Sequence, residues 1–162
     1  MSEHASTDAR EVTDQRAGRY LTFRLAEEEY GLEILKVREI VSLQAITAIP
    51  GTPDYVKGVI NLRGKVIPTV DLRLRFGLSE QEDTQTKAIV ITQVEGTEVG
   101  VIVDSVSEVL DVPTDCIEDT PSFGSTIDTS FMLGMAKLGG EVTLLLDLEK
   151  LLDKSTFSSV AA

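Results

Sequence analysis

Apolar residues along this chain occur in short runs that are rich in β-branched side chains. Each run is bounded by Gly, Pro or acidic residues, which are typical of turns. The pattern recurs at residues 20–25, 30–35, 37–43, 58–62, 65–70, 88–94, 98–106, 108–112 and 142–148. Runs of this length and spacing predict an all-β fold of small antiparallel barrels or sandwiches, in preference to alternating strands and helices.

Three short segments interrupt the strand pattern. Around residues 35–41, apolar side chains at positions 34, 37, 40 and 41 also fit a helical period, and we favour a strand, a turn and a strand there. Asp71 precedes the segment LRLRFG and Asp147 precedes LEKLL. An aspartate in this position caps the first turn of a helix, so we predict a short helix after each of them.

The chain contains an internal repeat. A shift of 69 residues superimposes residues 20–43 on 89–112, and a shift of 76 superimposes 57–72 on 133–148. The identical pairs include Gly31 with Gly100 and Gly58 with Gly134. A lone barrel of this size is only marginally stable, so we expect the two copies to pack together with a groove at their junction. We place the first subdomain at about 19–86 and the second at about 87–153, between a disordered tail (1–18) and a mobile one (154–162).

The charge of the chain is strongly acidic and unevenly distributed. It has 27 acidic and 15 basic side chains, a net charge of −12. Residues 1–87 carry 12 basic and 14 acidic side chains, whereas residues 88–162 carry 3 and 13. Nucleic acid is therefore an unsuitable partner, since it requires a concentrated basic surface.

No apolar stretch is long enough to span a membrane and no signal pattern is present, so we expect a cytoplasmic protein without membrane insertion.

Residues suited to catalysis are scarce. Cys116 is the single cysteine and His4 the single histidine, which excludes an internal disulfide, a structural zinc site and a catalytic triad. We expect no cofactor, no metal and no enzymatic activity. The alternative is a small β-barrel hydrolase or ligand-binding protein that uses Glu39 and Asp71, although no partner residues for such chemistry are evident.

Arg63 is the most informative candidate residue because the repeat supplies an internal control. It lies at the tip of a predicted hairpin, NLRGKV, where the second copy has Gly139 in KLGGEV. The turn therefore does not require arginine. Arg63 is either a tolerated surface residue or a guanidinium presented to a partner or to an acidic neighbour such as Glu39.

The ordered blocks of this chain resemble one known family. The segments YLTFRLAEEEYGLEILKVREI, IPGTPDYVKGVINLRGKVIPTVDLRLRFG, VGVIVDSVSEVL and LLLDLEKLL closely resemble the CheW family of bacterial chemotaxis coupling proteins, over about residues 19–153. The resemblance implies two five-stranded, SH3-like β-barrels. It also implies a non-enzymatic adaptor that joins the tips of methyl-accepting chemoreceptors to the regulatory domain of the histidine kinase CheA in arrays at the inner membrane, and that is a monomer when isolated. A scaffold of another chemosensory pathway, such as one controlling pilus motility, is the alternative.

The resemblance also implies which residues meet the partners. The receptor-binding groove would contain Val37, Glu39, Gly58, Arg63, Ala88, Gly100 and Val109. An ion pair between Glu39 and Arg63 is expected in this groove. Pro121 and Phe123, in the segment PSFG, would make the ring contact with the kinase. The alternative for Phe123 is that it caps the core of the second barrel.

Overall fold

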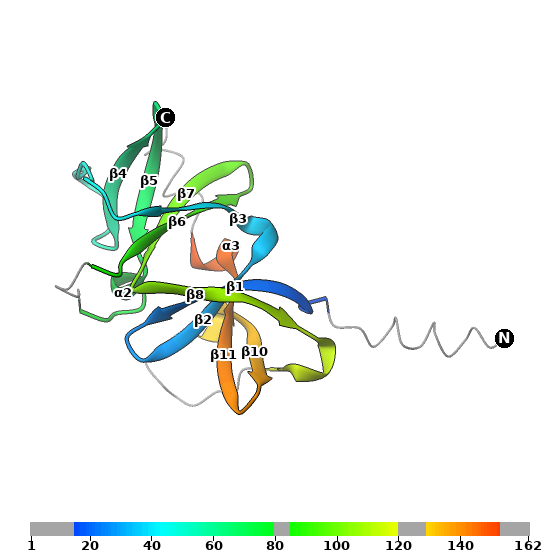
Figure 1. Ribbon diagram of the computed structural model, residues 1–162. Helices are drawn as coiled ribbons and strands as arrows, with labels where there is room; N and C mark the ends of the chain where they lie inside the picture. Colours follow the sequence, from blue (N-terminus) through cyan, green and yellow to red (C-terminus); the bar gives the residue numbers. More distant parts are fainter. Residues whose placement is uncertain (1–14, 80–84, 120–128, 153–162) are drawn as a thin grey trace.

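The computed structural model describes residues 15–79, 85–119 and 129–152, and these residues form mainly β-strands (Figure 1). The all-β prediction is confirmed. The strands are β1 (Gly18–Leu25), β2 (Glu28–Glu33), β3 (Val37–Ser42), β4 (Val56–Leu62), β5 (Lys65–Asp71), β6 (Ala88–Val94), β7 (Thr97–Val103), β8 (Ser105–Val112), β9 (Ile117–Glu118), β10 (Met132–Leu138) and β11 (Glu141–Leu146). The helical segments are η1 (Ile34–Lys36), α2 (Leu72–Arg75), η2 (Thr114–Cys116), η3 (Thr129–Phe131) and α3 (Leu148–Leu151). Among the described helices, none has the length and apolar character that crossing a membrane would require.

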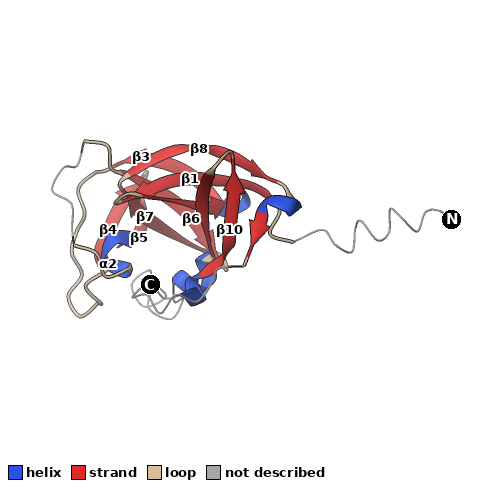
Figure 2. Cartoon of the chain, turned by 90° about the horizontal axis from the view of Figure 1, so that it is seen from below, coloured by secondary structure: helices blue, strands red, loops and turns tan. Residues whose placement is uncertain are grey.

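The strands form two sheets, which lie side by side in Figures 1 and 2. The five-stranded sheet has the order β3-β6-β7-β5-β4, and the six-stranded sheet has the order β8-β1-β2-β11-β10-β9. The sixth strand is the two-residue β9, which pairs with β10. The first copy has only an isolated bridge, Thr47 to Val59, at the corresponding place on β4. The two sheets are therefore built to one plan.

The short helices and the strand, turn and strand around residue 37 also form as predicted. η1 is a single 3-10 turn between β2 and β3. Asp71 accepts a hydrogen bond from the backbone N–H of Arg73 at 2.9 Å and begins α2. Asp147 accepts one from the N–H of Lys150 at 3.4 Å and begins α3. The repeat therefore extends to the caps, because both aspartates satisfy backbone N–H groups that the helix leaves free.

The two copies exchange their first hairpins. The repeat matches β1, β2 and β3 with β6, β7 and β8, and β4 and β5 with β10 and β11. Yet the hairpin β6–β7 of the second copy lies between β3 and β5 of the first, and β1–β2 lies between β8 and β11. The exchanged hairpins are held by parallel pairs, β5 with β7 and β2 with β11. The predicted division into residues 19–86 and 87–153 therefore does not correspond to the two sheets, because each sheet contains strands of both copies.

The largest hydrophobic core draws its side chains from both sheets. It contains Phe23 and Tyr30 of the six-stranded sheet, Val70 and Val101 of the five-stranded sheet, and Leu151 of α3, all buried. Burial, followed by the charge of Glu28, raises the pKa of Tyr30 above its ordinary value, because both disfavour a charged phenolate in this core. Each sheet also has a smaller core of its own, with Ile60, Ile89 and Ile102 in one and Tyr20, Ala136 and Leu145 in the other. The central core therefore makes the two sheets one unit.

An aromatic cluster with one cation joins the sheets at the helices. The rings of Tyr30 and Phe76 stack with centroids 5.5 Å apart. The guanidinium of Arg75, at the end of α2, lies 4.8 Å from the ring centre of Tyr55 and 4.3 Å from that of Phe131. Its Nε also donates a hydrogen bond of 2.9 Å to the carbonyl oxygen of Leu151. Arg75 thus connects the first copy to α3 and η3 of the second by cation–π contacts and a hydrogen bond.

Two ion pairs hold the segments where the chain passes from one sheet to the other. At the β7–β8 crossing, Arg73 donates to both oxygens of Asp104 at 2.9 Å, and these hydrogen bonds raise the pKa of the guanidinium. At the β2–β3 crossing, Lys36 donates to Glu149 at 2.5 Å, which raises the pKa of the lysine. The side chains of Arg73 and Asp104 are only 13% and 10% exposed, whereas that of Glu149 is 44% exposed. The pairs occupy comparable places in the two copies but differ in burial.

We predict that this difference in burial sets the energetic importance of the two pairs. Replacing Asp104 with Ala leaves a nearly buried guanidinium without its carboxylate, which should lower the free energy of unfolding by about 3 kcal/mol. Glu149→Ala removes an exposed partner and should cost about 0.5 kcal/mol. Urea unfolding followed by circular dichroism measures both. Equal losses in the two variants would contradict the prediction.

Candidate functional site

The turn between β4 and β5 presents Arg63 in a conformation that costs energy. Arg63 and Gly64 both have left-handed backbone angles, with φ of 53° and 86°, as a two-residue hairpin turn demands. The equivalent Gly139 and Gly140 have φ of 58° and 83°. The side chain of Asn61 supports the first turn by accepting a hydrogen bond of 2.9 Å from the N–H of Gly64. A left-handed non-glycine residue costs about 1 kcal/mol, so the turn itself would be more stable with glycine in place of Arg63.

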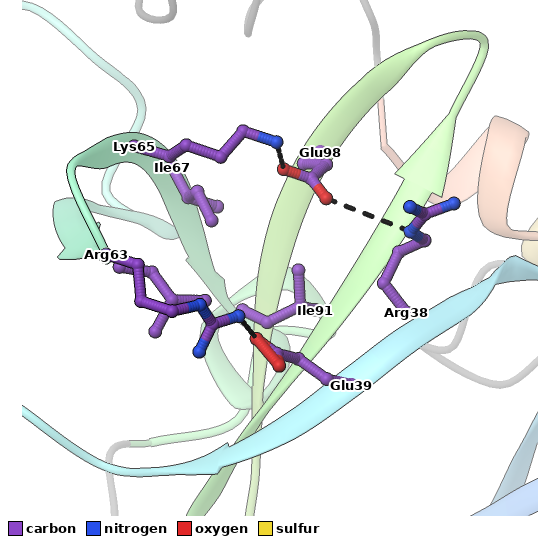
Figure 3. Close-up of a pocket in the computed structure, with 8 residues that line it drawn as sticks. Arg38, Glu39, Arg63, Lys65, Ile67, Ile91 and Glu98 are labelled. Atoms are coloured by element: carbon purple, nitrogen blue, oxygen red, sulfur yellow. Dashed lines mark hydrogen bonds and ion pairs between the residues drawn. The ribbon is translucent and has the colours of Figure 1, made fainter.

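The predicted ion pair between Arg63 and Glu39 is confirmed. A terminal nitrogen of the guanidinium donates a hydrogen bond to Oε2 of Glu39, across the space between the β4–β5 turn and β3 (Figure 3). The side chain of Arg63 is 71% exposed and that of Glu39 is 32% exposed. Such an exposed pair stabilises the fold by about 0 to 1 kcal/mol, which is no more than the energy that the left-handed backbone of the turn costs. The arginine is therefore better explained by what it presents to the solvent.

A second set of charges lies beside this pair. The ammonium of Lys65 donates to Oε1 of Glu98 at 2.7 Å. Nε of Arg38 lies 3.9 Å from the other oxygen of the same carboxylate, and its NH1 donates to the side chain of Gln93 at 2.9 Å. Glu98 therefore lies between two cations from different strands, β3 and β5 (Figure 3).

The two sets of charges line one cavity at the end of the five-stranded sheet. The cavity has a volume of about 240 Å³, and Ile67, Ile91 and Leu62 supply its apolar wall. A hollow of about 330 Å³ adjoins it and shares Arg38, Lys65, Ile67 and Glu98. Three cations and two carboxylates around an apolar wall form a surface suited to binding a charged segment of another protein.

The alternative enzymatic reading is not supported by this geometry. Asp71 is buried, caps α2 and is not among the residues that line the cavity with Glu39. Within the part of the chain that the structure describes, no three His, Cys, Asp or Glu side chains are placed to hold a metal ion. Glu39 instead forms the ion pair with Arg63.

Three other predicted groove residues lie outside the cavity. Val37 on β3 and Ala88 on β6 are half-buried and pack against the core between the sheets. Val109 on β8 belongs to the six-stranded sheet and is 51% exposed. The structure therefore brings Glu39 and Arg63 together and distributes these three over the junction and the other sheet. Pro121 and Phe123 lie outside the described residues.

The two predicted glycines have structural functions. Gly58 is buried at an irregularity of the β4–β5 pair, where a Cβ atom would lie 1.9 Å from the carbonyl oxygen of Thr47. Gly100 is buried on β7, where a Cβ atom would lie 2.9 Å from the side chain of Ile89. The equivalent Gly134 is also crowded, since a Cβ atom would lie 2.7 Å from the carbonyl oxygen of Glu118, whereas a Cβ atom at Gly31 would have its nearest contacts at 3.3 Å. Both glycines affect a binding surface only through the backbone that they allow.

Sequence reasoning did not identify Arg38, Lys65 and Glu98 as site residues. Lys65 follows the turn directly, and its equivalent in the second copy is Glu141, a reversal of charge. Arg38 is equivalent to Ser107. The comparison of the two copies that singled out Arg63 could also have identified Lys65 and Arg38. The contact between Lys65 and Glu98 could not be found in this way, because it depends on the hairpin exchange.

Comparison with known proteins identifies a family model, relatives and a solved structure that this chain resembles. The family model for the CheW-like domain matches residues 19–156. The chain is 40% identical over 144 residues to the chemotaxis protein CheW of Klebsiella aerogenes, covering 87% of this chain and 85% of that protein. It is 35% identical over 140 residues to CheW of Bacillus subtilis, covering 86% and 89%. The crystal structure of the scaffolding protein TtCheW from Thermoanaerobacter tengcongensis superimposes with a TM-score of 0.78 at 40% identity, covering 85% of this chain and 93% of that one.

We predict that Gly58 is required for folding. A methyl group at this position would collide with the backbone of Thr47, whose N–H and carbonyl both bond to Val59, so Gly58→Ala should lower the free energy of unfolding by about 3 kcal/mol. Gly51 also has a left-handed φ but open space around it, and Gly51→Ala should cost only about 1 kcal/mol. Urea unfolding of both variants tests this. A Gly58→Ala protein as stable as Gly51→Ala would show that the backbone can move apart.

Proposed function

The chain belongs to the CheW-like family and is a chemotaxis scaffold protein, and from this membership we propose that it couples the cytoplasmic tips of chemoreceptors to the histidine kinase CheA. The observation that carries the proposal is the similarity to named CheW proteins over most of both chains. We propose further that the chain acts in the cytoplasm beneath receptor clusters without entering the membrane, and that it is a monomer when isolated.

We propose that the coupling is non-enzymatic. The charged side chains of the cavity are engaged with one another, Arg63 with Glu39 and Lys65 with Glu98. This arrangement suits reversible recognition, because an incoming charged group can replace an exposed internal partner at little cost.

We propose that the receptor meets this chain at Arg63 and Glu39 and at the apolar residues Val37, Ala88 and Val109. The strained turn keeps an exposed guanidinium at the rim of the cavity, which supports a direct contact. Gly58 and Gly100 contribute by shaping β4 and β7. The kinase's regulatory domain would meet Pro121 and Phe123, as the family resemblance implies.

We predict that Arg63→Gly separates binding from folding. Glycine occupies the equivalent turn in the second copy, so the variant should unfold at the same urea concentration as the wild type or at a slightly higher one. Its affinity for a receptor cytoplasmic fragment should fall about tenfold, because the guanidinium is lost. Calorimetric titration measures the affinity. Unchanged binding together with lower stability would make Arg63 a structural residue.

A second prediction concerns the kinase. Titration of the wild-type chain into the regulatory domain of CheA from the same cell should show saturable one-to-one binding, and Phe123→Ser should weaken it, since a buried aromatic anchor contributes strongly to an interface. Arg63→Gly serves as the control, because it should leave this affinity unchanged. Absence of binding by the wild type, verified by sedimentation, would refute the coupling role.

A further inference from the structure

The cavity carries more positive charge than the adaptor's fold requires. The two copies share the positions of Glu39 and Glu98, which are matched by Glu108 and Glu29. The cations are not shared, since Arg38, Arg63 and Lys65 are matched by Ser107, Gly139 and Glu141. The surplus of cations is therefore specific to this end of the five-stranded sheet.

The second copy pairs the glutamate equivalent to Glu98 with a different cation. This glutamate, Glu29, accepts a hydrogen bond of 3.2 Å from Arg24 on the neighbouring strand. In the five-stranded sheet, the position of Arg24 is taken by Gln93, and the cations come from β3 and from the start of β5. Glu98 is thus held by cations that reach it from the rim of the cavity.

We infer that Arg38 and Lys65 form a second anchoring point beside Arg63, and that it accepts a carboxylate of the same receptor segment. The inference rests on the proposed receptor-binding function and adds the chemistry of the partner: a segment with two acidic side chains, one for Arg63 and one for the Arg38–Lys65 pair. In the free protein Glu98 occupies the second anchoring point. The incoming carboxylate replaces Glu98 as the partner of Arg38 and Lys65.

Three features support an acidic protein segment as the occupant. The chain has a net charge of −12, so an acidic segment is repelled by most of the surface and attracted where the cations exceed the carboxylates, three to two. The side chains of Lys65 and Arg38 are 69% and 56% exposed, so both are accessible. The exposed apolar residue Val66 lines the adjoining hollow together with Lys65 and provides apolar contact area there.

The test measures the affinity of the full-length chain for a receptor cytoplasmic fragment at 50 mM and 500 mM NaCl, by calorimetric titration. At low salt, Lys65→Gln and Arg38→Gln should each weaken binding about threefold, and Lys65→Glu about tenfold. The differences from the wild type should nearly disappear at high salt, because the charges are exposed and screened. Lys137→Gln, which removes an exposed lysine of the six-stranded sheet, is the control and should bind like the wild type.

The decisive variant is Glu98→Gln. If Glu98 competes with the incoming carboxylate, removing its charge should tighten binding about threefold at low salt. A merely structural Glu98 would give unchanged or weaker binding. Glu29→Gln makes the same change of charge at the equivalent position of the other sheet and controls for the net charge. Urea unfolding of every variant confirms that the fold is retained.

The outcomes distinguish the two proposals. Wild-type binding that none of the Arg38, Lys65 and Glu98 variants changes would overturn the second anchoring point and leave the receptor-coupling role intact. Equal effects of Glu98→Gln and Glu29→Gln would also overturn it, because net charge alone would then explain the gain. Failure of the folded wild type to bind the fragment at either salt concentration would overturn both.

Discussion

Each sheet of this protein is complete only when it contains a hairpin of the other repeat, and the rest of the structure depends on that exchange. β6–β7 supplies the centre of the five-stranded sheet and β1–β2 supplies the centre of the six-stranded one. Both parallel pairs, β7 with β5 and β2 with β11, join strands of different repeats, and they form because the chain crosses between the sheets twice, at β2–β3 and at β7–β8. The crossings are held by Lys36 with Glu149 and by Arg73 with Asp104. A single core shared by both sheets follows directly.

The candidate site depends on the same exchange. Arg38 and Glu39 come from β3, Arg63 and Lys65 from the β4–β5 hairpin, and Glu98 from β7 of the second repeat. Because β7 is inserted beside β5, Glu98 reaches Lys65 at 2.7 Å although the two residues belong to different copies. The positions of the charges at the rim therefore depend on where the exchanged hairpin lies. A shift of that hairpin would alter the surface offered to a partner.

Much of this could be predicted from the sequence, for local physical reasons. Short runs rich in β-branched residues and bounded by turn residues identified most of the strands, although β10 was not among them. Asp71 and Asp147 identified the helix starts. Each of these signals acts within a few residues. The pairing of Arg63 with Glu39 came from family resemblance. The hairpin exchange could not be predicted, since a repeat shows which strands are equivalent and says nothing about which copy they pair with. The contact of Lys65 with Glu98 was missed for the same reason, and so was the structural function of Gly58, whose crowding by Thr47 is a tertiary contact.

The internal duplication distinguishes residues that maintain the fold from residues that give one sheet its own surface. Gly58 with Gly134 and Asp71 with Asp147 are kept in both copies, and each has a structural explanation in backbone crowding or helix capping. Arg63 and Lys65 have diverged to Gly139 and Glu141 on hairpins with turns of the same length. A scaffold protein must make different contacts through different surfaces, and two copies of one architecture achieve this when only the exposed charges diverge. The strained backbone of Arg63 supports this division, because the fold alone would favour glycine there.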